Sequence, residues 1–192
     1  MADPDSSGEK THIRELYYQS LRAEILERIK MREQVLFAYL GAVAALVGYA
    51  LSKPEGESSG LLTGALLAVI PVLAYGTSVS LGRHSEIIGS FNLYLARPEW
   101  MDMPVWDYYS AKDGHAEKSQ SALFKSQIAI LLGPWVIVIA INFLKPLTKF
   151  EIAMLVTGLV FAILTAARLH RAKSARIESI RQILALYPDR EA

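Results

Sequence analysis

The titratable residues of the sequence do not show the spacing of a catalytic or metal site. The four histidines are far apart in the chain: His12, His84, His115 and His170. Asp113, His115 and Glu117 alternate at an expected helix start, where a solvated helix cap is a better interpretation than a metal site. The sequence contains no cysteine, which excludes thiolate ligands and disulfides. We therefore expect neither a metal site nor a cofactor.

Motifs of common enzymes are missing as well. The sequence has no Walker-type phosphate loop, no glycine-rich dinucleotide fingerprint after a strand and no serine in a nucleophile elbow. These observations favour a protein that is not an enzyme. The net charge of +1 gives no sign of duplex nucleic acid as a partner.

The elements that must position any functional residue are helices whose surroundings change from water to lipid along their length. The stretch LRAEILERIKMREQVLFAYLGAVAALVGYAL, Leu21 to Leu51, has charged residues only among its first thirteen positions. Neither glycine nor proline interrupts the chain between Thr11 and Leu40. The pattern predicts one continuous helix that passes from water into hydrocarbon.

Four segments without a charged residue have about the length that a helix needs to cross a bilayer. They are Val35–Leu51, Leu61–Leu81, Ile128–Leu144 and Ile152–Ala167. The alternative is a soluble bundle with very apolar core helices, but such helices should keep a polar stripe. Because the segments lack ionisable carboxylates, an intramembrane protease or a carboxylate proton relay is not supported. We expect four membrane spans.

The basic residues predict how these spans are oriented. Seventeen of the twenty lysines and arginines lie in the N-terminal arm, the central segment and the C-terminal tail, which must share one side of the membrane. By the positive-inside rule this side is the cytoplasm. The sequence therefore predicts a multi-pass protein of the inner membrane with both termini cytoplasmic. Its outer loops are short, so we expect its function to face the cytoplasm.

The predicted fold is all-α, a four-transmembrane-helix bundle with helices extended into the cytoplasm. We divide the chain into a disordered N-terminus (1–10), an amphipathic arm helix (11–34), a four-span membrane domain (35–167) and a tail helix (168–192). The membrane domain includes a cytoplasmic central segment (82–127), in which Ser110 and Asp113 have the spacing of a capping box.

The arm carries an apolar stripe with a four-residue period that needs a partner. Its residues are Ile13, Tyr17, Leu21, Ile25 and Ile29. The partner could be another helix, a cytoplasmic protein or the surface of the inner leaflet.

Basic and aromatic residues of the cytoplasmic parts are candidates for binding an anionic ligand or a partner. They are Arg28, Arg32, Trp100, Trp106, Tyr108, Tyr109, Arg171 and Arg176. The alternative for the aromatic residues, which lie between 97 and 115, is an interfacial belt at the level of the lipid headgroups. The alternative for the arginines is a solvated helix face.

Two sets of residues in and beside the spans predict packing and permeation. Small residues at packing intervals would let helices approach closely: Gly41, Ala45, Gly48, Gly64 and Ala68. Polar residues follow Pro71, which should kink the second span. If copies of this span surrounded a pore, they would form a wall that favours anions: Tyr75, Thr77, Ser78, Ser80, Arg83 and His84. The alternative is packing within one chain, with the hydroxyls bonded to their own helix.

The layout resembles that of small multi-span membrane proteins of bacteria. The arm LRAEILERIKMREQ runs directly into a first span, and further spans and a small cytoplasmic portion follow. Some proteins of this kind are membrane effectors of antiphage defence. The resemblance implies a homo-oligomer that permeabilises or depolarises the inner membrane when a nucleotide-like signal reaches its cytoplasmic side.

Our first functional hypothesis is a non-enzymatic, oligomeric membrane protein that conducts ions or disrupts the membrane under the control of its cytoplasmic helices. Its conduction would favour anions, and an anionic nucleotide-like ligand would control it. The alternative is a membrane scaffold that recruits a soluble partner through these helices. A transporter subunit or a membrane enzyme is a further alternative.

Overall fold

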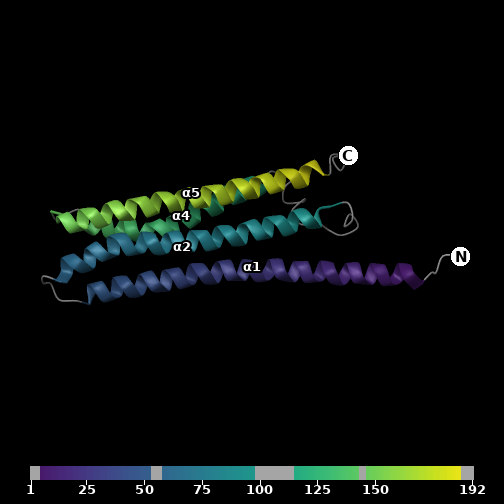
Figure 1. The fold of residues 1–192 in the computed structure, drawn as a ribbon, viewed down its shortest axis with the longest axis horizontal. Coiled ribbons are helices and arrows are strands. Elements are labelled where there is room, and N and C mark those ends of the chain that lie inside the picture. Colours follow the sequence, from purple (N-terminus) through teal and green to yellow (C-terminus); the bar gives the residue numbers. More distant parts are fainter. Residues whose placement is uncertain (1–4, 53–57, 98–114, 143–145, 187–192) are drawn as a thin grey trace.

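The computed structural model describes residues 5–52, 58–97, 115–142 and 146–186. These residues form four helices and no strand (Figure 1). The helices are α1 (Asp5–Leu51), α2 (Ser58–Leu95), α4 (His115–Asn142) and α5 (Lys149–Ala185). The predicted all-α class is therefore confirmed.

All four helices are long and apolar enough to cross a membrane. They contain 28 to 47 residues, whereas about 20 suffice for the hydrocarbon core. Each helix therefore has residues to spare beyond the bilayer. The protein is a multi-pass four-helix membrane bundle with helices extended beyond the membrane.

Two of the predicted boundaries between elements lie inside continuous helices. The arm and the first span form the single helix α1, which already begins at Asp5, within the residues predicted to be disordered. The fourth span and the tail form the single helix α5. Helix α2 ends at Leu95, three residues before Pro98. The predicted capping box of Ser110 and Asp113 lies outside the described residues.

The charged portions of all four helices lie at the same end of the bundle. The N-terminal end of α1 and the C-terminal end of α5 both lie at this end, and the apolar portions lie toward the other (Figure 1). We call it the charged end. It comprises α1 up to Glu33, α2 from Arg83, α4 up to Lys125 and α5 from Arg168.

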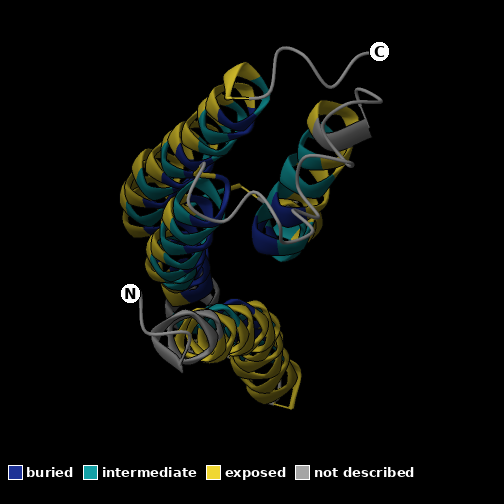
Figure 2. Cartoon of the chain, turned by 90° about the vertical axis from the view of Figure 1, so that its right-hand side faces the viewer, coloured by how far each residue is buried: buried dark blue, intermediate teal, exposed yellow. Residues whose placement is uncertain are grey.

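Helix α2 is the centre of the bundle, because it packs against each of the other three. Its fully buried side chains include Leu67, Ile70 and Ser78. Helix α1 is the outermost helix and is exposed along most of its length (Figure 2). Its few buried residues include Tyr39 and Val43. The closest packing in the bundle is between α2 and α5, and the main apolar core takes residues from all four helices.

A tryptophan compensates for the proline inside α2. Pro71 has no backbone N–H, so the carbonyl of Leu67 loses its usual helical partner. The indole N–H of Trp135 on α4 donates to this buried carbonyl at 2.8 Å. Gly158 on α5 makes room for the contact, because a Cβ there would overlap the Leu67 oxygen and lie 3.1 Å from the indole nitrogen. Three helices thus meet at one satisfied polar group, as hydrocarbon surroundings require.

Three further hydrogen bonds that involve side chains hold α1 against α4 and define the start of α5. The Tyr39 hydroxyl donates to the backbone carbonyl of Leu131 and ties α1 to α4. Helix α5 begins with a capping box, in which the Thr148 hydroxyl accepts from the Glu151 N–H and the Glu151 carboxylate accepts from the Thr148 N–H.

Candidate anion-binding site

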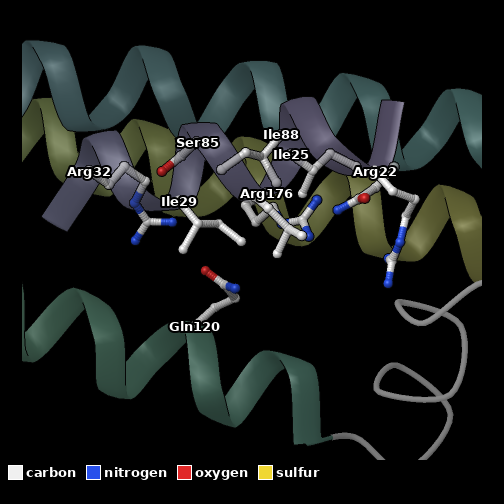
Figure 3. A pocket seen from close by; sticks show the side chains of 10 residues that line it. Arg22, Ile25, Ile29, Arg32, Ser85, Ile88, Gln120 and Arg176 are labelled. Carbon is white, nitrogen blue, oxygen red and sulfur yellow. The ribbon is translucent and has the colours of Figure 1, made fainter. Parts of the chain in front are cut away.

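A cavity of about 500 Å³ lies among the four helices at the charged end. Its volume is within the range of small-molecule sites. Figure 3 shows side chains from all four helices around it. The residues that line it are Arg22, Ile25, Leu26, Ile29, Arg32, Ser85, Ile88, Asn92, Gln120 and Arg176.

The lining combines cationic, polar and apolar groups. Three arginines face the cavity, together with one hydroxyl and two side-chain amides. Isoleucine and leucine side chains supply the rest of the wall. No aspartate or glutamate is among the described lining residues. Guanidinium groups bind phosphates and carboxylates by parallel N–H donors, so the cavity suits an anion that also has an apolar part.

Helical spacing explains how the sequence places these residues together. Arg22, Ile25, Ile29 and Arg32 follow one another at intervals of three and four on α1, which puts them on one face. Ser85, Ile88 and Asn92 repeat this spacing on α2. Part of the apolar stripe predicted on the arm therefore faces the cavity.

The electrostatics of Arg32 are unfavourable when the cavity holds no anion. Its side chain is half-buried, and its Nε is buried without a hydrogen-bond partner in the described structure. Burial lowers the pKa of Arg32, the positive charge of Arg176 lowers it further, and Glu33 opposes both effects. An anion in the cavity would offset this repulsion and accept the buried N–H.

Other arginines of the charged end are paired with glutamates outside the cavity. Arg28 bonds to Glu24 on its own helix, with an Nε to oxygen distance of 2.7 Å. Two more pairs cross between helices: Arg168 with Glu86 at 3.0 Å and Arg181 with Glu117 at 3.3 Å. These glutamates are not among the described residues that line the cavity.

His84 lies beside this group of arginines at the end of the second span. Its Nδ1 is buried and has no hydrogen-bond partner in the part of the chain that the structure describes. Burial lowers the pKa of His84, and the charges of Arg28, Arg32 and Arg83 lower it further. The folded chain therefore favours the neutral imidazole.

The structure brings together part of the predicted ligand-binding set. Arg32 and Arg176 line the cavity, Arg28 is held by Glu24 next to it, and Arg171 is exposed on α5 away from the lining. The four aromatic candidates lie outside the described residues: Trp100, Trp106, Tyr108 and Tyr109. Arg22 and Gln120 also line the cavity but were not among the predicted residues, although the spacing of Arg22 from Arg32 on the arm was a usable signal.

The predicted pore residues do not share one surface of the chain. Ser78 is fully buried and donates its hydroxyl to the carbonyl of Tyr75 on the same helix, at 2.7 Å. The Tyr75 ring packs edge-on against Phe161 of α5. Four candidates are half-buried or exposed: Thr77, Ser80, Arg83 and His84. Ser78 therefore packs within its own chain.

The predicted small-residue faces have different surroundings. Gly64 and Ala68 are buried on α2, and a Cβ at Gly64 would meet the ring of Phe150 on α5. Gly41, Ala45 and Gly48 are exposed on α1, where a Cβ at either glycine would meet open space. The first face is used inside the chain, whereas the second is available for other contacts.

No group of three histidine, aspartate or glutamate side chains that could hold a metal ion occurs in the described ranges. Comparisons with protein-family models, with curated proteins and with solved structures found no match to this chain.

Proposed function

We propose that several copies of this chain assemble in the inner membrane of a bacterium into an ion channel or membrane-disrupting effector. An anionic nucleotide-like ligand, bound in the cavity at the charged end, controls it. The observation that carries the proposal is the cavity itself, where Arg32 on α1 and Arg176 on α5 face a space without acidic lining residues. Antiviral defence is the role that best fits such an effector.

The cavity is suited to control because its walls come from all four helices. A ligand that contacts α1, α4 and α5 together would favour one arrangement of these helices over another. Helix α1 has the fewest contacts to the rest of the bundle, so it is the element that such a ligand would move most easily. Since α1 runs without interruption into its span, the motion would reach the membrane.

The charged end faces the cytoplasm in this proposal. The positive-inside distribution of lysine and arginine supports this orientation. A ligand made inside the cell would then reach the cavity directly.

Conduction requires several copies, because the interior of one bundle is filled with side chains such as Leu67, Ile70 and Leu131. The open face of Gly41, Ala45 and Gly48 on α1 offers a surface for close helix contacts between copies. Arg83, exposed at the end of the second span, would attract anions to the mouth of such an assembly.

Planar-bilayer recording of the purified full-length protein tests this proposal. We expect conductance that depends on a nucleotide added to the charged side, drawn from a panel of nucleoside triphosphates and dinucleotides. Anions should permeate in preference to cations, and Arg83→Gln should reduce this preference, whereas Lys149→Gln at the other end should not. Absence of conductance with every nucleotide of the panel would contradict the proposal.

A membrane scaffold is the second candidate, and the distal part of the arm favours it. Ile13, Leu16 and Tyr17 are about half exposed on the water-facing part of α1. A soluble partner could bury this patch. If the scaffold function is correct, replacing the three residues with serine should abolish co-purification of a specific cytoplasmic protein and leave conductance absent in all variants.

A further inference from the structure

We infer that the cavity at the charged end binds a ligand with at least two separate phosphate groups and an apolar or planar part between or beside them. This inference deepens the proposed function by naming the ligand class of the same site. It concerns binding alone, so it can be tested without any conductance.

The arginines form a row along the cavity. Arg22 and Arg32 are ten residues apart on α1, which corresponds to about 15 Å along a helix axis. Figure 3 shows them at opposite ends of the cavity, with the Arg176 side chain from α5 between them. A single phosphate is too small to contact both ends at once. A ligand that uses the whole row must therefore carry separate anionic groups.

The wall between the arginines is apolar and would be left unused by a bare polyphosphate. Ile25, Ile29 and Ile88 lie between Arg22 and Arg32 in Figure 3. Contact with these side chains favours a ligand with a planar ring or a short hydrocarbon portion. Gln120 and Ser85, which face the same space, can bond to hydroxyl groups of a sugar or a glycerol.

The position of the cavity allows two sources for such a ligand. Arg32 comes three residues before the predicted first span, and Ser85 comes four residues after the second. The cavity therefore begins at the edge of the membrane and continues into water. A soluble nucleotide with phosphates at two separate positions and the headgroup of a lipid with two phosphodiesters share the required chemistry.

Equilibrium binding to the full-length protein in nanodiscs tests the inference. The soluble probes are inorganic phosphate, pyrophosphate and adenosine 3′,5′-bisphosphate, whose two phosphates are separated by the ribose, and binding is measured by calorimetry at one ionic strength. We expect adenosine 3′,5′-bisphosphate to bind about 10-fold or more tightly than phosphate, because its separated phosphates engage guanidinium groups at different places along the row. Pyrophosphate should lie between the two. In the lipid arm, nanodiscs with diphosphatidylglycerol are compared with nanodiscs of equal charge that contain phosphatidylglycerol.

Variants at the two ends of the row sharpen the test. Arg22→Gln and Arg32→Gln should each weaken binding of the two-phosphate probe about 10-fold, while binding of phosphate changes less. Arg171→Gln removes the same charge from an exposed site on α5 outside the cavity and should leave both affinities unchanged. Arg22 is exposed, so its replacement should not impair folding. Arg32→Lys should restore part of the affinity.

A preference for adenosine 3′,5′-bisphosphate identifies a soluble ligand, and retention of diphosphatidylglycerol over phosphatidylglycerol identifies a lipid. Either result supports the inference if the variants at both ends remove the preference. The inference would be overturned if the one-phosphate and two-phosphate probes bound equally and the two lipids were retained equally. Equal effects of Arg32→Gln and Arg171→Gln would also overturn it. Binding of a two-phosphate probe without any conductance would contradict the proposed channel and leave this inference standing.

Discussion

At the scale of single residues, the arginines of the charged end differ in what surrounds them. Arg28, Arg168 and Arg181 contact glutamates and contribute ordinary, largely solvent-screened ion pairs. Arg32 lies in a wall without acidic groups, and its buried Nε lacks an acceptor among the described residues. A buried donor without a partner lowers the stability of the fold. Such a donor is most readily tolerated where a bound ligand supplies the acceptor.

His84 makes the stability of the ligand-free protein depend on pH. Its pKa is lowered from 6.5 in the folded chain, so the unfolded chain binds the proton more readily. Stability contributed by neutral His84 is present above about pH 6.5 and is lost as the pH falls below that value. We expect the midpoint temperature of unfolding to decrease as the pH is lowered from about 8 to about 5.5. His84→Gln should make this decrease smaller. Thermal unfolding in detergent measures both.

The exposed histidine of α5 provides the matched control. His170→Gln should leave the pH dependence as in the parent protein, since this side chain is exposed at the charged end. Identical pH profiles for His84→Gln and the parent protein would refute the assignment to His84.

Sequence spacing could identify the arginines of the site only in part. Helical periodicity places Arg32 on one face of the arm, but no pattern within one helix says that Arg176 and Gln120 from other helices lie around the same cavity. Likewise, Arg28 and Arg32 are both arginines of the arm, and only the ion pair of Arg28 with Glu24 distinguishes them. Such contacts depend on the rotation of each helix about its axis, which the sequence alone does not determine.

At the scale of elements, the packing of α2, α4 and α5 depends on the indole N–H of Trp135. It supplies the hydrogen bond that Pro71 cannot donate to the Leu67 carbonyl. Trp135→Phe should destabilise the bundle by about 1 to 3 kcal/mol, because the Leu67 carbonyl then lacks a donor in an apolar setting. Pro71→Ala would supply the missing backbone N–H. In that background we expect Trp135→Phe to cost much less. A double-mutant cycle on unfolding free energies measures the difference.

A nearby aromatic residue controls for lost packing. Phe161→Leu changes the aromatic contact with Tyr75 and leaves the Leu67 carbonyl untouched, so its cost should be the same with and without the Pro71→Ala substitution. If Trp135→Phe costs the same in both backgrounds, the indole does not compensate for the proline.

Charge distribution and helix length were sufficient to predict the four spans, because both properties are local. The same local information did not indicate that α1 begins at Asp5 or that α5 starts with the capping box of Thr148 and Glu151. The bond from Trp135 to Leu67 joins residues 68 positions apart. Predicting this bond would have required knowing which helices are neighbours. Pro71 in an apolar span indicated only that some donor must be near.

At the scale of the whole molecule, α1 is both the least buried helix and the one whose charged portion lines the cavity. Its membrane portion exposes Gly41, Ala45 and Gly48, whereas Val43 on the same helix is buried against its own bundle. If copies assemble through this face, helix backbones can approach closely there. A ligand at the charged end could then act on the contacts between copies through one continuous helix.

Single cysteines test this arrangement without interference, since the chain contains no native cysteine. In membranes treated with an oxidant, Ala45→Cys should give a disulfide-linked dimer in high yield. Val43→Cys, which is buried within its own chain, and Ala153→Cys, which is exposed on α5, should give little. Similar yields at Ala45 and Ala153 would mean that copies meet by random collision, and the α1 face could not then be the surface through which the proposed oligomer forms.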